Sequence, residues 1–93
     1  MTIVELAKKL SEMYENSPEG EKVSMIHLFG IRYSNEINKN NYVAGEIINN
    51  TKLRNGEKMK ASYHAEISKG VKMSKHVIDK ESINTFIKLF GKK

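Results

Sequence analysis

The sequence has no cysteine and no tryptophan, only one proline, and no long run of apolar residues. Without cysteine the chain can form no disulfide, use no thiol nucleophile and bind no zinc through sulfur. No stretch approaches the roughly 20 apolar residues that a membrane-spanning helix requires, and the first residues lack the basic region and apolar run of a secretory signal. These absences predict a cytoplasmic protein that does not enter the membrane.

The motifs of common enzyme classes are also missing. The chain has no Gly-rich phosphate loop and no nucleophile elbow. Its three histidines, His27, His64 and His76, are not spaced as metal ligands are, and His64 and Glu66 would face different sides of a helix. His27 lies beside an apolar stripe, where a half-buried, hydrogen-bonded histidine is expected. We therefore predict a protein without enzymatic activity, and without a metal or other cofactor.

What the chain does have is the composition of one small globular domain. It has 93 residues, of which 39% are hydrophobic and 29% are charged. This composition is too apolar for a disordered chain, and the length is too short for two domains. We therefore expect residues 1–93 to form a single helical domain.

Charge is distributed unevenly between the two halves. Residues 1–50 carry five basic and seven acidic side chains, a net charge of −2, whereas residues 51–93 carry eleven basic and four acidic ones, a net charge of +7. A basic half on a small domain attracts polyanions, most often nucleic acid. A solvated basic surface without a partner explains the same composition.

The first half of the chain predicts two helices. Apolar residues at helical spacing follow a capping box formed by Thr2 and Glu5, so a first helix should run from about residue 3 to 15 or 16. Ser17-Pro18-Glu19 has the residues of a helix start, which predicts a long, central second helix with an apolar stripe from Val23 to Ile37. Gly30 lies within this stripe at a cost of about 1 kcal/mol relative to alanine. Its presence predicts the close approach of another helix.

The second half predicts three shorter elements. Residues 42–50 form a short helix, although their β-branched content leaves a strand open. A polar turn at 51–56 precedes a helix over 59–69, and Gly70 is expected to end that helix in a left-handed conformation. Residues 71–78 fit a short helix or the strand of a small wing. A last helix should begin at Asp79. The predicted fold is therefore all-α, a compact bundle of about five helices.

The two short helices and the polar turn between them have the layout of a helix-turn-helix unit over about residues 42–70. If Met59, Tyr63 and Ile67 face inward, the second helix presents polar and cationic groups outward, as a helix in the major groove of DNA requires. The outward set also contains Glu66. The residues predicted to bind double-stranded DNA are Lys58, Lys60, Ser62, His64, Ser68, Lys69, Lys72 and Lys75.

The segment from Ser62 to Lys72, Ser-Tyr-His-Ala-Glu-Ile-Ser-Lys-Gly-Val-Lys, resembles the recognition helix of lambda-repressor-like (Cro/repressor) domains. It is also similar to small bacterial helix-turn-helix-like proteins. The resemblance covers about residues 42–75, and the turn from Asn50 to Lys58 is longer than in the standard motif. It implies sequence-selective DNA binding by a small bacterial transcriptional regulator or by the DNA-reading subunit of a larger system.

An apolar stripe near the C-terminus consists of Ile83, Phe86, Ile87 and Phe90. It either closes the core or forms the interface of a homodimer, since helix-turn-helix proteins generally read paired half-sites. A different function also fits the sequence. In that alternative the protein is an interaction module, whose basic face binds an acidic protein and whose C-terminal stripe binds an apolar groove.

Overall fold

The structure, a computed structural model, describes residues 1–76. These residues contain no strand, only an isolated antiparallel bridge between Lys52 and Lys58, and the prediction of an all-α fold is confirmed. The last predicted helix and the stripe of Ile83, Phe86, Ile87 and Phe90 lie outside the described residues. In chain order the elements are α1 (Ile3–Glu15), α2 (Lys22–Arg32), α3 (Ser34–Lys39), α4 (Ala44–Asn49), the 3-10 turn η1 (Ala61–Tyr63) and α5 (His64–Met73).

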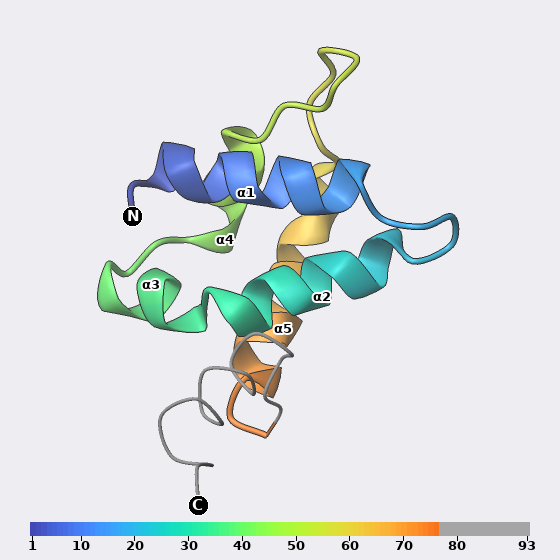
Figure 1. Cartoon of the computed structure of the whole chain (residues 1–93). Helices are drawn as coiled ribbons and strands as arrows, with labels where there is room; N and C mark the ends of the chain where they lie inside the picture. Colours follow the sequence, from blue (N-terminus) through green and yellow to red (C-terminus); the bar gives the residue numbers. More distant parts are fainter. Residues whose placement is uncertain (77–93) are drawn as a thin grey trace, which may run out of the picture.

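The helices surround one apolar core. α1 packs against α2 and α4, while α5 packs mainly against α2 and also touches α4. In Figure 1, α5 passes behind α2, and the loop between α4 and α5 projects from the top of the molecule. Phe29 of α2 is fully buried at the centre of this arrangement. The remaining buried residues of the core come from all five α-helices and, in the case of Met59, from the segment before α5: Leu6, Leu10, Ile26, Ile37, Ile47, Ile48, Met59 and Ile67.

The start of α1 is the predicted capping box. The Thr2 hydroxyl accepts a hydrogen bond from the Glu5 amide at 3.1 Å, and the Glu5 carboxylate accepts one from the Thr2 amide at 2.7 Å. The bond from the Thr2 amide lowers the pKa of the Glu5 carboxyl. Both bonds satisfy amides that a helix start leaves unpaired, so α1 begins and ends where its sequence predicts.

The predicted start of the second helix at Ser17 is wrong. The Ser17 hydroxyl donates to the Tyr14 carbonyl at 2.7 Å, so it closes the end of α1 instead of capping α2. Gly20 then takes a positive φ of 83°, which an α-helix cannot contain. The ammonium of Lys22 donates to the same Tyr14 carbonyl at 3.1 Å and lies over its ring. The turn is thus held by the end of α1, and α2 begins only at Lys22. Val23, predicted on the apolar stripe, is 41% exposed.

The second helix is also shorter than predicted at its other end. α2 ends at Arg32, and Tyr33, with φ −107° and ψ 18°, separates it from α3. The Tyr33 ring packs against Phe29, with ring centroids 5.2 Å apart. The long central helix is therefore two helices, although Ile26 and Ile37 of the predicted stripe are both buried.

Gly30 has the predicted close neighbour, which is Gly70 of α5. A Cβ added at Gly30 would lie 2.6 Å from the Ile67 carbonyl oxygen and 2.9 Å from Gly70 Cα. The prediction that Gly70 ends its helix in a left-handed conformation is wrong, because Gly70 lies inside α5, buried against α2. Both glycines are there because two helix backbones touch at this point, which leaves no room for side chains.

We predict that Gly70→Ala destabilises the protein. A Cβ at Gly70 would overlap the His27 carbonyl oxygen and lie 3.0 Å from Gly30 Cα. Only a shift of one helix can relieve these contacts with backbone atoms, so the free energy of unfolding should fall by about 1–3 kcal/mol, measured by urea denaturation. The matched control is Gly45→Ala in α4, where a Cβ meets nothing within 4 Å; this variant should be as stable as the wild type or more stable. Equal stability of the two variants would contradict the close α2–α5 contact.

Candidate nucleic-acid interface

The predicted pair of short helices is present, with different bounds and a different connection. α4 covers Ala44–Asn49, and α5 covers His64–Met73 rather than starting at residue 59. Met59 lies in an extended segment, because its neighbour Lys58 pairs with Lys52 across a hairpin. Its side chain is still buried, as is that of Ile67, while Tyr63 is half-buried. The inward positions were therefore predicted correctly on a segment whose helix starts later.

The outward face of α5 is continuous. His64, Ser68 and Lys72 stand at i, i+4 and i+8, and all three are exposed, so they lie along one side of the helix. Lys69 is exposed beside them, and Lys75 follows the end of α5. Of the segment 71–78, for which a helix and a wing strand were both open, residues 71–73 continue α5 and residues 74–76 form a turn. The structure places at the surface all eight residues predicted to bind DNA, namely Lys58, Lys60, Ser62, His64, Ser68, Lys69, Lys72 and Lys75.

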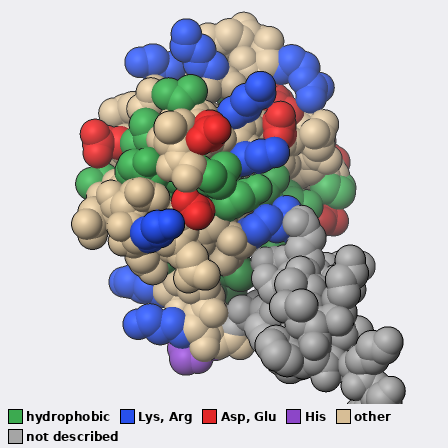
Figure 2. Space-filling model, turned by 60° about the vertical axis from the view of Figure 1, so that its left-hand side comes forward, with side chains coloured by type: hydrophobic (Ala, Val, Ile, Leu, Met, Phe, Trp, Pro, Cys, Tyr) green, Lys and Arg blue, Asp and Glu red, His purple; other side chains and the backbone are tan. Residues whose placement is uncertain are grey.

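These residues divide between two places. Lys58 and Lys60 belong to the projecting loop, whereas Lys69, Lys72 and Lys75 belong to the opposite end of the segment (Figure 1). Figure 2 shows Lys and Arg side chains around the loop at the top and again at the lower edge, with acidic and basic groups mixed between them. The basic surface therefore has two groups of lysines joined by η1 and the first turn of α5.

Glu66, predicted on the outward face, is half-buried because it binds α2. His27 Nε2 and Glu66 Oε1 are 2.6 Å apart, and Lys69 Nζ lies 3.6 Å from the other carboxylate oxygen. The hydrogen bond with His27 is the main reason why the pKa of the Glu66 carboxyl is lowered, and the Lys69 charge adds to it. His27 is thus the half-buried, hydrogen-bonded residue that its position predicts. The pair holds α5 on α2 one turn away from the contact between Gly30 and Gly70.

The pairing of His27 with Glu66 was not predicted, because 39 residues separate them in the chain. Only the register of α2 against α5 brings them together, and that register follows from the two glycines. The sequence gives only an indirect signal of this pair. It places a histidine on one predicted helix and a glutamate on another, each three or four residues before a glycine.

We predict that Glu66 makes the stability of the protein fall at acid pH. Because folding lowers the pKa of this carboxyl, its contribution is fully present above the ordinary glutamate value of about 4.3 and is lost as the pH falls through the lower, folded value. Thermal unfolding between pH 6 and pH 3 should show a smaller acid-induced drop for Glu66→Gln than for the wild type. Glu46→Gln, a change of an exposed carboxyl on α4, is the control and should keep the wild-type drop. Identical profiles for all three proteins would contradict the role of the pair.

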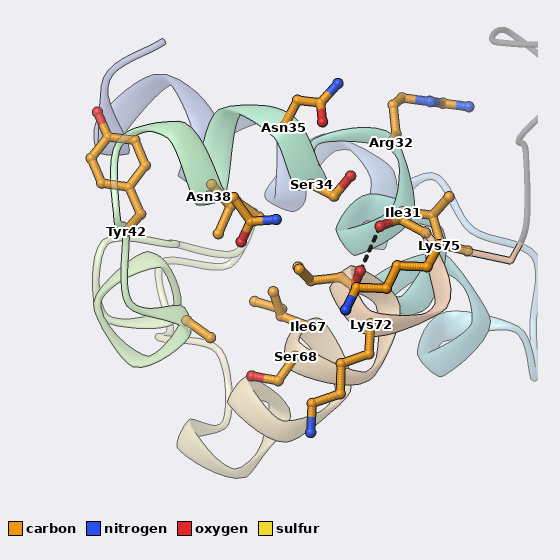
Figure 3. A pocket seen from close by; sticks show the side chains of 14 residues that line it. Ile31, Arg32, Ser34, Asn35, Asn38, Tyr42, Ile67, Ser68, Lys72 and Lys75 are labelled. Atoms are coloured by element: carbon orange, nitrogen blue, oxygen red, sulfur yellow. Dashed lines mark hydrogen bonds between the residues drawn. The ribbon is translucent and has the colours of Figure 1, made fainter.

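A pocket of about 790 Å³ lies beside the outward face of α5. Its lining includes the apolar side chains of Ile31 and Ile67, together with polar groups from two sides. Figure 3 shows Asn35 and Asn38 on the α3 side, and Ser68 and Lys72 on the α5 side. Lys75, which follows the end of α5, extends its side chain across the pocket. Next to it, the Ser74 hydroxyl donates a hydrogen bond to the Val71 carbonyl at that helix end. The exposed face of α5 is therefore bordered by a groove with hydrogen-bonding groups on both edges.

The part of the chain that the structure describes contains neither a metal-binding cluster nor a membrane-spanning helix. Among residues 1–76 there is no group of three His, Cys, Asp or Glu side chains that could hold a metal ion. In the same part of the chain, no helix has the length and apolar character needed to cross a membrane. Chemically, this surface offers amines that carry positive charge, and hydroxyls, amides and imidazole groups that form hydrogen bonds.

The comparisons with known proteins agree with this arrangement. A family described as an HTH-like domain matches residues 2–80, which is most of the chain. Comparisons with curated proteins and with solved structures find no match. The family match supports the helix-turn-helix type, but not the lambda-repressor-like group in particular. The chain belongs to the family of HTH-like domains.

Proposed function

We propose that the protein binds double-stranded DNA without catalysing a reaction, with α5 as the helix that enters the major groove. The observation that carries the proposal is the outward face of α5, on which His64, Ser68 and Lys72 are aligned and exposed. The inward face of the same helix is fixed by the glycine contact and by the bond between His27 and Glu66. A rigid helix with a free polar face is what major-groove recognition requires.

The side chains of this face have different roles in the proposal. Lys69, Lys72 and Lys75 bind phosphates, because an ammonium on a flexible stem neutralises a phosphate without reading the base sequence. His64 and Ser68 lie on the first two turns of the helix and carry groups that donate and accept hydrogen bonds. They contact base edges, as residues near the start of a recognition helix do.

In the cell we propose that the protein is a small bacterial transcriptional regulator in the cytoplasm, or the DNA-reading subunit of a larger system. The resemblance of residues 62–72 to lambda-repressor-like recognition helices supports this role. The stripe of Ile83, Phe86, Ile87 and Phe90 would then pair two chains, so that two copies of α5 meet two half-sites. Sedimentation velocity of the full chain tests this pairing, and a monomer at tens of micromolar would rule it out.

We predict that Lys69→Ala/Lys72→Ala weakens binding to all duplexes alike. Loss of two phosphate contacts should reduce the slope of log affinity against log salt by about 0.9 for each contact, measured by fluorescence anisotropy. The control is Lys9→Ala/Lys39→Ala, which removes the same charge from α1 and α3 and should bind nearly as the wild type does. A wild-type protein that binds no duplex DNA even at low salt would contradict the proposed function and favour an acidic protein as partner.

In contrast, His64→Ala should change which sequence is preferred. A selection from random duplexes gives the preferred site, and the affinities for that site and for a scrambled one are then compared. Loss of a base contact should narrow the difference by about 1–3 kcal/mol while leaving the salt slope unchanged. An equal loss of affinity for both duplexes would instead indicate that His64 contacts the DNA phosphate backbone and not a base.

A further inference from the structure

The loop between α4 and α5 is an anchored hairpin, although a simple turn was predicted for residues 51–56. The Leu53 amide donates to the Glu57 carbonyl at 2.8 Å, and Gly56 turns the chain with a φ of 88°. The base of the hairpin is tied to its surroundings. Buried Thr51 donates from its hydroxyl to the Ile47 carbonyl at 2.6 Å, and the Ser11 hydroxyl of α1 donates to the Lys52 carbonyl at 2.7 Å. The hairpin is therefore held in one position before any partner binds.

The alternation of an extended chain sorts the side chains of the hairpin onto two faces. Leu53 packs against the core and Met59 is buried within it, so both point inward. The residues directly before and after Leu53 and Met59 therefore point outward. These flanking residues are all exposed and all cationic: Lys52, Arg54, Lys58 and Lys60.

Lys52 and Lys58 stand directly opposite each other across the bridge. Like charges at opposite positions of an antiparallel pair repel each other. Glu12 and Glu15 of α1 line the same surface hollow as Lys52, and each has another partner: Glu12 Oε1 is 3.9 Å from Lys9 Nζ, and Glu15 accepts a hydrogen bond from the Arg54 amide. Glu57, the only acidic residue of the hairpin, accepts a hydrogen bond from the Asn55 side chain. Within residues 1–76, neither lysine of the pair has a carboxylate within ion-pair distance.

We propose that this hairpin is a second contact with DNA, which binds the phosphate backbone on one flank of the site read by α5. The inference rests on the proposed function and deepens it. A polyanion is the partner that makes the Lys52–Lys58 pair favourable, because phosphates placed between the two ammonium groups replace their repulsion by attraction. The regular spacing of phosphates along a duplex suits cations held on one rigid face better than an irregular acidic protein surface does.

The connection to α5 places both contacts on the same duplex. Lys60 immediately precedes η1, which leads directly into His64 at the start of α5. The hairpin projects beyond the helices at the end from which α5 begins (Figure 1). With α5 in the major groove, the hairpin therefore meets the backbone next to that groove. The hairpin therefore lengthens, on one side, the stretch of DNA backbone that the protein covers, without contacting base edges.

The test compares Lys52→Ala/Lys58→Ala with Lys9→Ala/Lys39→Ala, two variants with the same net charge. In anisotropy titrations on a duplex that carries the preferred site, the hairpin variant should bind about 10- to 30-fold more weakly near physiological salt, and its salt slope should be lower by up to about 1.8. Hydroxyl-radical footprints should lose protection on the same flank of each half-site, while the preferred sequence is unchanged. Since the substitutions remove a repulsion, the melting temperature should remain the same or rise. Lys52→Arg/Lys58→Arg should bind as the wild type does.

The outcomes separate this inference from the proposed function. Suppose that Lys52→Ala/Lys58→Ala matches Lys9→Ala/Lys39→Ala in affinity, salt slope and footprint. The hairpin then does not contact DNA. The proposed function still holds in that case if the wild type binds DNA and Lys69→Ala/Lys72→Ala binds it weakly. A change in the preferred sequence would also overturn the backbone role. If the wild type binds polyglutamate but no duplex, both proposals fail together.

Discussion

The contact between α2 and α5 at Gly30 and Gly70 is the constraint on which the rest of the structure depends. Two helix backbones can approach this closely only where neither carries a side chain, so the glycines fix both the place and the register of the crossing. That register puts Ile67 into the core and brings Glu66 within 2.6 Å of His27. It also decides which side of α5 remains exposed. A change at either glycine would therefore move the outward face as a whole.

The parts of the fold that depend on neighbouring residues could be predicted from the sequence. Thr2 and Glu5 of the capping box bond to each other within one helical turn, so the box forms without contacts to distant parts of the chain. Helical spacing likewise predicted that Ile67 faces inward, and Ile67 is buried. Ser17 shows where this reasoning fails. Serine before proline is a good helix start, but here its hydroxyl donates to the end of the preceding helix.

The errors in the second half have a common physical cause. Local preference predicts a helix stop at Gly70 and a helical core position for Met59. Their positions are decided instead by residues distant in sequence: Gly70 meets Gly30 of α2, and Met59 is drawn into an extended segment by the pairing of Lys58 with Lys52. The candidate site shows the same division. The exposed positions of α5 follow from periodicity, whereas the His27–Glu66 pair and the basic hairpin follow from tertiary contacts that no local pattern contains.

The two faces of α5 have separate roles, one in the fold and one at the exposed surface. A ten-residue helix is marginal in isolation, so α5 depends on α2 and α4 for its structure, and its inward face carries that task alone. His64, Ser68 and Lys72 make no hydrogen bond or ion pair with the described part of the chain through their side chains, so they can change without cost to the fold. Target preference can therefore change by substitutions on this face, while the glycine contact and the hairpin keep the helix and the flanking backbone contact in place. Affinity and sequence preference would then be set by separate groups of residues on one rigid support.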